Sequence, residues 1–204
     1  MAGKRNNRCR PQDQTSSNGH AAQDATVTLP SLHEAVLAAT GGLINPSPWF
    51  NHSAGLDGEA TAVDEYSTNI MAHFQCPNSG CGRAGWGSKK VGILIRRYYS
   101  SHHDSDINNP NVWPLFGAGA GAEAMGYDAV VFNQRCKRCN GLGAMAVDEG
   151  AYVERVAYRL KKWAGVPMAT QVYAPRLLGP EHESELCEGC KAGYCMRSAI
   201  RQHD

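Results

Sequence analysis

Residues 182–195 read HESELCEGCKAGYC and place one histidine and three cysteines within fourteen positions. The four side chains are separated by four, two and four residues, and they are His182, Cys187, Cys190 and Cys195. Thiolate sulfur and imidazole nitrogen are the usual ligands of tetrahedral zinc, and a tight turn can present several of them to one ion. The same residues could instead form a disulfide or a reactive thiol centre, so the choice depends on the rest of the chain.

Two more cysteine pairs lie upstream, in CPNSGC at residues 76–81 and in CKRC at residues 136–139, and turn-forming residues follow each pair. Two thiolates on such a turn can both reach one zinc ion at about 2.3 Å. The three motifs together supply two complete sets of four ligands, which are Cys76, Cys81, Cys136 and Cys139 in one and His182, Cys187, Cys190 and Cys195 in the other. Spacing alone also allows the downstream CxxC to join an upstream pair. Only Cys9 is left over.

The disulfide and redox alternatives are less favourable than zinc. The N-terminal residues MAGKRNNRCRPQ carry no apolar signal region, and no stretch is long and apolar enough to cross a bilayer. We therefore expect a cytoplasmic or nuclear protein, whose cysteines stay reduced. A redox CxxC would be expected at a strand-to-helix junction in a βαβ unit, and only the pair at 136–139 comes near that setting.

The first set encloses a long connection, because 54 residues separate Cys81 from Cys136. Closing a loop of that length costs about 3.5 kcal/mol. A structural zinc ion contributes about 10–16 kcal/mol at neutral pH, which is enough to offset the closure. The sequence therefore predicts two zinc ions per chain as the only cofactors.

The pattern between the motifs predicts a small antiparallel sheet with one packed helix. Residues 69–76 and 127–136 have the composition of strands, and in KKVGILIRRYY the side chains of Val91, Ile93 and Ile95 share one face while Leu94 lies on the other. A long loop containing GAGAGA spans residues 99–126. In residues 148–165 an apolar stripe has helical period, with acidic residues at the start and lysines at the end. The predicted fold class is α+β, and we expect two zinc sites to stabilise the sheet and its helix.

The order of FQC, GWGSKKVGILI, YDAVVFNQRCKRC and HESELCEGCKAGYC resembles the 3CxxC-type zinc-binding domain, found in fungal proteins and in the related receptor-transporting and zygote arrest proteins. The resemblance covers about residues 69–197 and is closest to the fungal branch. It implies zinc binding, and the zygote arrest relatives add RNA binding as an expectation. The first pair here is Cys-x4-Cys rather than Cys-x2-Cys, and because residues 197–204 are the polar RSAIRQHD, we do not expect the hydrophobic C-terminal anchor of receptor-transporting proteins.

The chain then divides into four parts. Residues 1–30 are polar and aperiodic and are expected to form a disordered tail. Residues 31–68 are expected to form a short helix over 31–40, started by a capping box of Ser31 and Glu34, and a linker. The zinc-binding domain is expected over 69–197, and a polar tail over 198–204.

Charge is concentrated in the middle of the chain. Residues 74–163 carry twelve Lys and Arg against seven Asp and Glu, a net charge of +5, whereas residues 1–73 carry −3 and residues 164–204 carry −1. Basic residues with interleaved aromatics are typical of RNA-binding surfaces. The candidate nucleic-acid contacts are Lys89, Lys90, Arg96, Arg97, Arg135, Lys137, Arg138, Arg155, Arg159 and Lys162.

Neither ligand set predicts an enzyme. A catalytic zinc keeps one position open for water, whereas both sets here can be filled by protein ligands. No nucleophile elbow, P-loop or dinucleotide-binding motif is present, and no small-molecule substrate is indicated. The predicted function is a zinc-stabilised, non-enzymatic adaptor or interaction module with an unidentified protein partner, and the alternative is an RNA-binding zinc-finger protein.

Overall fold

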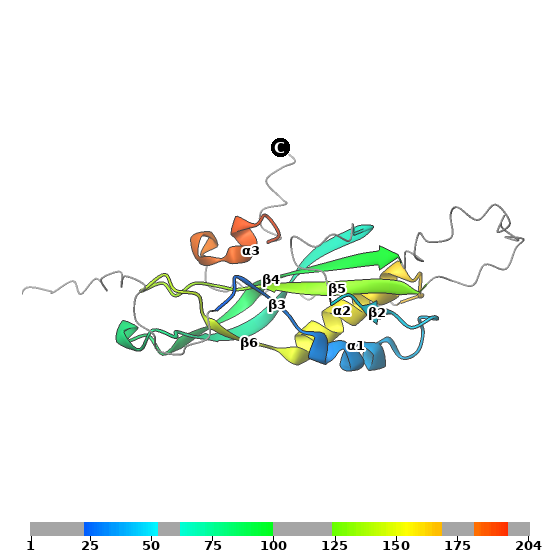
Figure 1. The fold of residues 1–204 in the computed structure, drawn as a ribbon, viewed down its shortest axis with the longest axis horizontal. Helices are drawn as coiled ribbons and strands as arrows, with labels where there is room; N and C mark the ends of the chain where they lie inside the picture. Colours follow the sequence, from blue (N-terminus) through cyan, green and yellow to red (C-terminus); the bar gives the residue numbers. More distant parts are fainter. Residues whose placement is uncertain (1–22, 53–61, 100–123, 169–181, 196–204) are drawn as a thin grey trace, which may run out of the picture.

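The structure is a computed structural model, and it describes residues 23–52, 62–99, 124–168 and 182–195. Its centre is an antiparallel sheet whose long strands are β3 (Asp64–Gln75), β4 (Gly85–Tyr99) and β5 (Met125–Phe132). The strand order is β1-β5-β4-β3-β6, with β1 (Thr26–Thr28) and β6 (Ala144–Val147) outermost. Figure 1 shows helices α1 (His33–Thr40) and α2 (Glu149–Trp163) on one side of the sheet and the short α3 (Glu188–Lys191) on the other. The predicted α+β class is therefore confirmed.

The main core lies between the sheet and helices α1 and α2. Val91, Ile93 and Ile95 of β4 face this core, in the alternation expected of a strand. Helix α2 contributes the apolar stripe expected from its period, of which Tyr152 and Leu160 are fully buried. Asp148 caps the helix, because its carboxylate accepts a hydrogen bond from the Ala151 N–H at 3.0 Å.

The opposite face of the sheet has a smaller apolar cluster. Leu94, Val130 and Phe132 form it, and Tyr194 stacks on Phe132 with ring centroids 5.5 Å apart. All eight residues of β5 are buried, because this strand is covered from both faces. Strand β4 also has apolar side chains on both faces, because Leu94 lies opposite Val91, Ile93 and Ile95, as the sequence predicted.

The N-terminal segments are more ordered than expected. We predicted a disordered tail over residues 1–30, but β1 pairs with β5 through Thr26 and Phe132, while residues 1–22 lie outside the described part. The predicted linker contains β2 (Trp49–Phe50), which also pairs with β5, and β3 begins at Asp64 rather than near residue 69. Strands β1 and β2 have only three and two residues, so their pairing depends on β5 rather than on their own sequence, while the polar start of β3 pairs with β4.

The predicted capping box does not form. A 3₁₀ turn covers Pro30–Leu32, so that α1 begins at His33 and its N-cap is Leu32, with no side-chain cap bond. Proline favours the first turn of a helix, and here it takes the position that Ser31 was expected to define. The C-terminal end agrees with the prediction, because Gly41 has a left-handed φ of 66°.

A buried ion pair lies on the same face as the smaller cluster. The Arg96 guanidinium donates to Asp128 from Nε at 3.0 Å and from a terminal nitrogen at 2.6 Å, and the Tyr98 hydroxyl donates to the same carboxylate at 3.1 Å. Asp128 is fully buried and Arg96 is 7% exposed. Burial raises the pKa of Asp128, and the hydrogen bonds from Arg96 oppose that shift.

We predict that Asp128→Ala destabilises the fold by about 3–5 kcal/mol, because a buried guanidinium loses its carboxylate. The measurement is urea denaturation with zinc in excess. Asp64→Ala is the matched control, since Asp64 pairs with Arg97 on the neighbouring strand but its side chain is 39% exposed. That change should cost about 0–1 kcal/mol. Equal losses in the two variants would contradict the assignment of Asp128 as a buried structural partner.

Candidate metal centres

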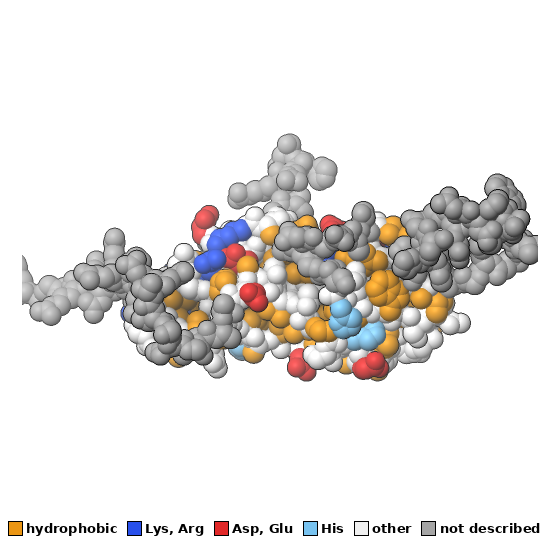
Figure 2. Space-filling view, viewed as in Figure 1, with side chains coloured by type: hydrophobic (Ala, Val, Ile, Leu, Met, Phe, Trp, Pro, Cys, Tyr) orange, Lys and Arg blue, Asp and Glu red, His pale blue; other side chains and the backbone are white. Residues whose placement is uncertain are grey.

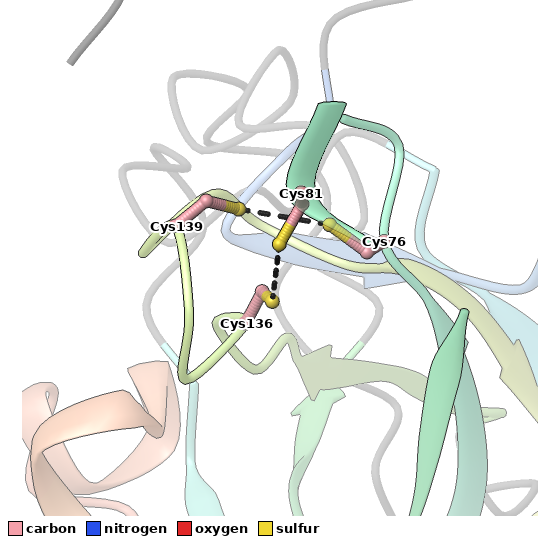
Figure 3. A group of neighbouring side chains, drawn as sticks. All are labelled: Cys76, Cys81, Cys136 and Cys139. Carbon is pink, nitrogen blue, oxygen red and sulfur yellow. Dashed lines mark hydrogen bonds between the residues drawn. The ribbon is translucent and has the colours of Figure 1, made fainter. Parts of the chain in front are cut away.

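The first centre joins the ends of two strands that are far apart in sequence. Cys76 and Cys81 follow β3, and Cys136 and Cys139 follow β5, with β4 lying between those strands in the sheet. Figure 3 shows the four sulfurs converging from these two turns. The structure thus brings together the first set of four cysteines.

Both turns have the conformation that small and polar residues favour. In the first, the Asn78 side chain accepts a hydrogen bond from the Gly80 N–H at 3.0 Å, and Gly82 has a left-handed φ of 65°. In the second, Asn140 has a φ of 60°, and its N–H donates to the Cys136 carbonyl at 2.8 Å. Asparagine and glycine adopt this conformation at low cost, so the residues after each pair fix the turn.

The sulfur geometry fits a tetrahedral ion. Cys76 and Cys139 have Sγ atoms 3.6 Å apart, and Cys81 and Cys136 have Sγ atoms 3.7 Å apart. Zinc–sulfur bonds of about 2.3 Å in a tetrahedron place sulfurs about 3.8 Å from one another. A disulfide would require about 2.05 Å, and all seven described cysteines are free. The disulfide alternative is therefore wrong for these residues.

The pKa values of these cysteines also indicate a site suited to a cation. Burial raises the pKa of Cys76 to about 12, because four crowded thiols cannot all ionise in a poorly solvated turn. Burial acts in the same direction at Cys136, but hydrogen bonds from the backbone of Cys139 and Arg138 lower its pKa to about 7. A divalent cation at the centre of the set would remove the repulsion among thiolates, while the backbone donors already favour the ionised sulfur.

The second centre lies on the sheet face opposite α2. His182 Nε2 lies 3.1 Å from Cys190 Sγ and 3.5 Å from Cys195 Sγ, so this ring nitrogen faces the sulfurs. Cys187 completes the set, and the four ligand atoms all lie within 4.8 Å of one another. A hydrogen bond with Cys195 and burial both raise the pKa of Cys187, which again indicates thiols packed for a cation.

The second centre lies directly on the sheet, with Gly189 over Gly92, and Gly189 is the tighter of these two positions. A Cβ on Gly92 of β4 would lie 3.7 Å from Gly189 Cα and 3.8 Å from the Tyr194 carbonyl oxygen. A Cβ on Gly189 would lie only 3.2 Å from Phe132 Cβ. Gly92 stands inside the apolar run VGILI of β4, and a glycine in a strand interior is typical of close backbone approach. A glycine within this apolar run is therefore a sequence feature that indicates a segment packed against the sheet.

The predicted basic contacts do not form one surface. Arg96 is buried against Asp128, whereas Arg97 faces the α2 side, where its guanidinium lies 5.9 Å from the centre of the Trp163 ring. Arg159 lies 3.1 Å from the centre of the Tyr66 ring, and Arg135 is paired with Glu188. Lys137 is paired with Glu183. The residues with exposed side chains among the ten are Lys89, Lys137, Arg138 and Lys162.

Both sets fit zinc, because sulfur and nitrogen donors in tetrahedral geometry select this ion over the oxygen-preferring cations. We predict two zinc ions per folded chain, measured by elemental analysis. Cys139→Ser and Cys190→Ser should each reduce the zinc content and leave a protease-sensitive protein, because each site supplies on the order of 10 kcal/mol to a fold of ordinary stability.

Cys9→Ser is the control for both ligand variants. Cys9 belongs to neither set and lies outside the described residues, so its replacement should leave zinc content and protease resistance unchanged. Equal zinc content in all three variants would rule out the ligand assignment.

Comparison with known proteins agrees with the geometry. A family model of the 3CxxC zinc ribbon, described as a zinc-binding domain, matches residues 69–193. No curated protein and no solved structure matches the chain. The matched region exceeds half of the 204 residues and includes every ligand of the two sets except Cys195, which follows it by two positions. The chain therefore belongs to the 3CxxC zinc-ribbon family of zinc-binding domains.

Proposed function

We propose that this protein is a non-enzymatic, zinc-stabilised interaction module of the cytoplasm or nucleus, and that its partner is another protein. The observation that carries the proposal is that each metal set consists of four protein ligands, seven of the eight being thiols. A set of this kind fills all four tetrahedral positions of zinc, whereas a catalytic zinc keeps one for water or substrate.

Two carboxylates beside the second centre, Glu188 and Glu183, have structural partners. Glu188 accepts hydrogen bonds from Arg135 at 2.5 Å and from Lys191 at 2.8 Å. Partial burial works to raise its pKa, but these two cations leave the pKa of Glu188 below its ordinary value. Glu183 accepts a hydrogen bond from Lys137 at 2.8 Å. Carboxylates held in ion pairs of this kind favour a structural role over general acid or base catalysis.

The surface offers apolar side chains to a protein partner. Leu43, Val63, Met71 and Tyr99 are large, apolar and exposed. Figure 2 shows apolar side chains distributed along the visible face, with few charges between them. Among the described residues, no helix is both long enough and apolar enough to cross a membrane.

RNA remains the alternative partner, and the geometry supports it less well. Arg96 is buried, and the guanidinium of Arg159 on α2 packs on the ring of Tyr66, although both residues were candidate nucleic-acid contacts. A clean test of RNA binding must therefore avoid these two residues. Lys89, Arg138 and Lys162 have exposed side chains and can be changed to glutamine with little effect on packing.

The test compares two surface variants with the wild type, all loaded with zinc. In the apolar variant, Leu43 and Met71 are replaced by serine, and in the basic variant Lys89, Arg138 and Lys162 are replaced by glutamine. Each protein is immobilised and incubated with cell extract, and the retained protein and RNA are measured separately with and without ribonuclease. We expect ribonuclease-resistant retention of a discrete protein, reduced several-fold in the apolar variant and unchanged in the basic variant.

A second measurement, the affinity for purified single-stranded RNA as a function of salt, tests the alternative that the partner is RNA. An RNA-binding surface would show affinity that falls with salt, and the slope should shrink by about 0.7 for each phosphate that the basic variant can no longer bind. That result, together with no protein retained after ribonuclease, would overturn the proposal. Equal retention of the same protein by all three samples would reject Leu43 and Met71 as docking residues.

A further inference from the structure

The residues next to metal ligands in one centre contact residues next to metal ligands in the other. Arg135, which precedes Cys136, pairs with Glu188, which follows Cys187, at 2.5 Å. Lys137, which follows Cys136, pairs with Glu183, which follows His182, at 2.8 Å. Figure 2 shows lysine and arginine side chains gathered beside acidic ones near α3. We call residues 133–137 the shared segment.

Backbone hydrogen bonds join the same two regions. The Arg135 N–H donates to the Leu186 carbonyl at 2.7 Å, and the Glu188 N–H donates to the Asn133 carbonyl at 3.0 Å. Gln134 and Cys187 form an antiparallel bridge between these two bonds. Because Cys187 is itself a ligand of the second centre, its backbone position is set by the shared segment.

The other side of the shared segment is fixed by the first centre. Arg135 forms a bridge with Leu142, and the Cys136 N–H donates to the Gly141 carbonyl at 2.8 Å, so the segment and the second cysteine turn form one hairpin. The Arg135 side chain also donates to the Asn140 carbonyl at 3.0 Å, directly after Cys139. One guanidinium therefore contacts the turn of the first centre and the carboxylate beside the second.

The two ion pairs differ in their surroundings. The side chains of Arg135 and Glu188 are 27% and 13% exposed, whereas those of Lys137 and Glu183 are 64% and 48% exposed. Solvent screens the exposed pair, which should contribute little, while the half-buried pair with its additional bond to Asn140 should contribute more.

We infer that the shared segment couples the two centres, so that zinc bound at one raises the affinity of the other, with Arg135 as the main positioning residue. Zinc at the first centre fixes the hairpin, which presents Arg135 and two backbone groups to the segment that carries Cys187. The coupling is reciprocal, because a gain in affinity at one site must appear equally at the other. Coupling between sites is typically about 5- to 150-fold in affinity.

The experiment removes zinc from the full-length protein with a chelator while NMR follows each centre separately. The amide of Gly80 reports the first centre and the amide of Ala192 reports the second. In the wild type we expect both signals to change over the same range of free zinc, with a Hill coefficient above 1. In Arg135→Gln the two transitions should separate, and the coupling factor should fall several-fold, while the folded spectrum at saturating zinc is retained.

Two controls make the result specific. Lys137→Gln also removes one positive charge next to Cys136 and should leave the coupling factor within about twofold. Asp148→Ala removes the N-cap of α2 and lowers stability without touching the shared segment, so its two transitions should stay together.

Three outcomes would overturn the inference. The first is independent zinc release from the two centres in the wild type. The second is an unchanged coupling factor in Arg135→Gln. The third is an equal fall in Asp148→Ala and Arg135→Gln, because coupling would then be a property of the whole fold. If Arg135→Gln does not fold even at saturating zinc, Glu188→Gln provides the same test from the other side of the pair.

Discussion

The fold depends on the meeting of two cysteine turns at the ends of β3 and β5. These strands are separated in the sheet by β4, and the four sulfurs of Cys76, Cys81, Cys136 and Cys139 converge beyond it. A zinc ion there closes a long connection and fixes the relative position of three strands at once. The apolar core on the α2 side can then form against a sheet whose end is already fixed, which is why loss of this site should affect much more than the turns themselves.

The second centre packs directly on the sheet. It lies over Gly92, with Gly189 close to Phe132, and Tyr194 stacks on the same phenylalanine. Helix α3 has only four residues and would not be stable alone. The sheet, the metal ligands and the shared segment together stabilise it, so the position of this centre relative to the first depends on the shared segment.

Much of the fold and of the ligand sets could be predicted from local pattern. The alternation of Val91, Ile93 and Ile95 and the helical stripe around Tyr152 and Leu160 are local properties, and ligand spacing is a property of short turns. The pairing of cysteine motifs between centres could not be chosen from sequence, because it depends on which strand ends lie side by side. The strands β1 and β2 were missed for the same reason, since their partners are distant residues of β5.

Charged residues were the least predictable part. Arg96 and Arg97 are adjacent and were assigned to one basic surface, yet strand alternation sends them to opposite faces, where one pairs with Asp128 and the other contacts Trp163. Asp128 within the apolar run YDAVVF indicated a buried partner, and that signal was available in the sequence. The contact between Arg135 and Glu188 had no local signal, because it requires the two metal centres to be placed side by side.

X-ray absorption at the zinc edge measures the atoms bound to the metal, so it distinguishes two closed four-ligand sites from sites that hold water. One set holds four cysteines and the other holds three cysteines and one histidine, so two ions share seven sulfurs and one nitrogen, an average of 3.5 sulfurs and 0.5 nitrogen per zinc. We expect this ratio for the zinc-loaded protein, with zinc–sulfur distances of about 2.3 Å and no bound water. An average of three or fewer sulfurs with added oxygen ligands would contradict two closed structural sites.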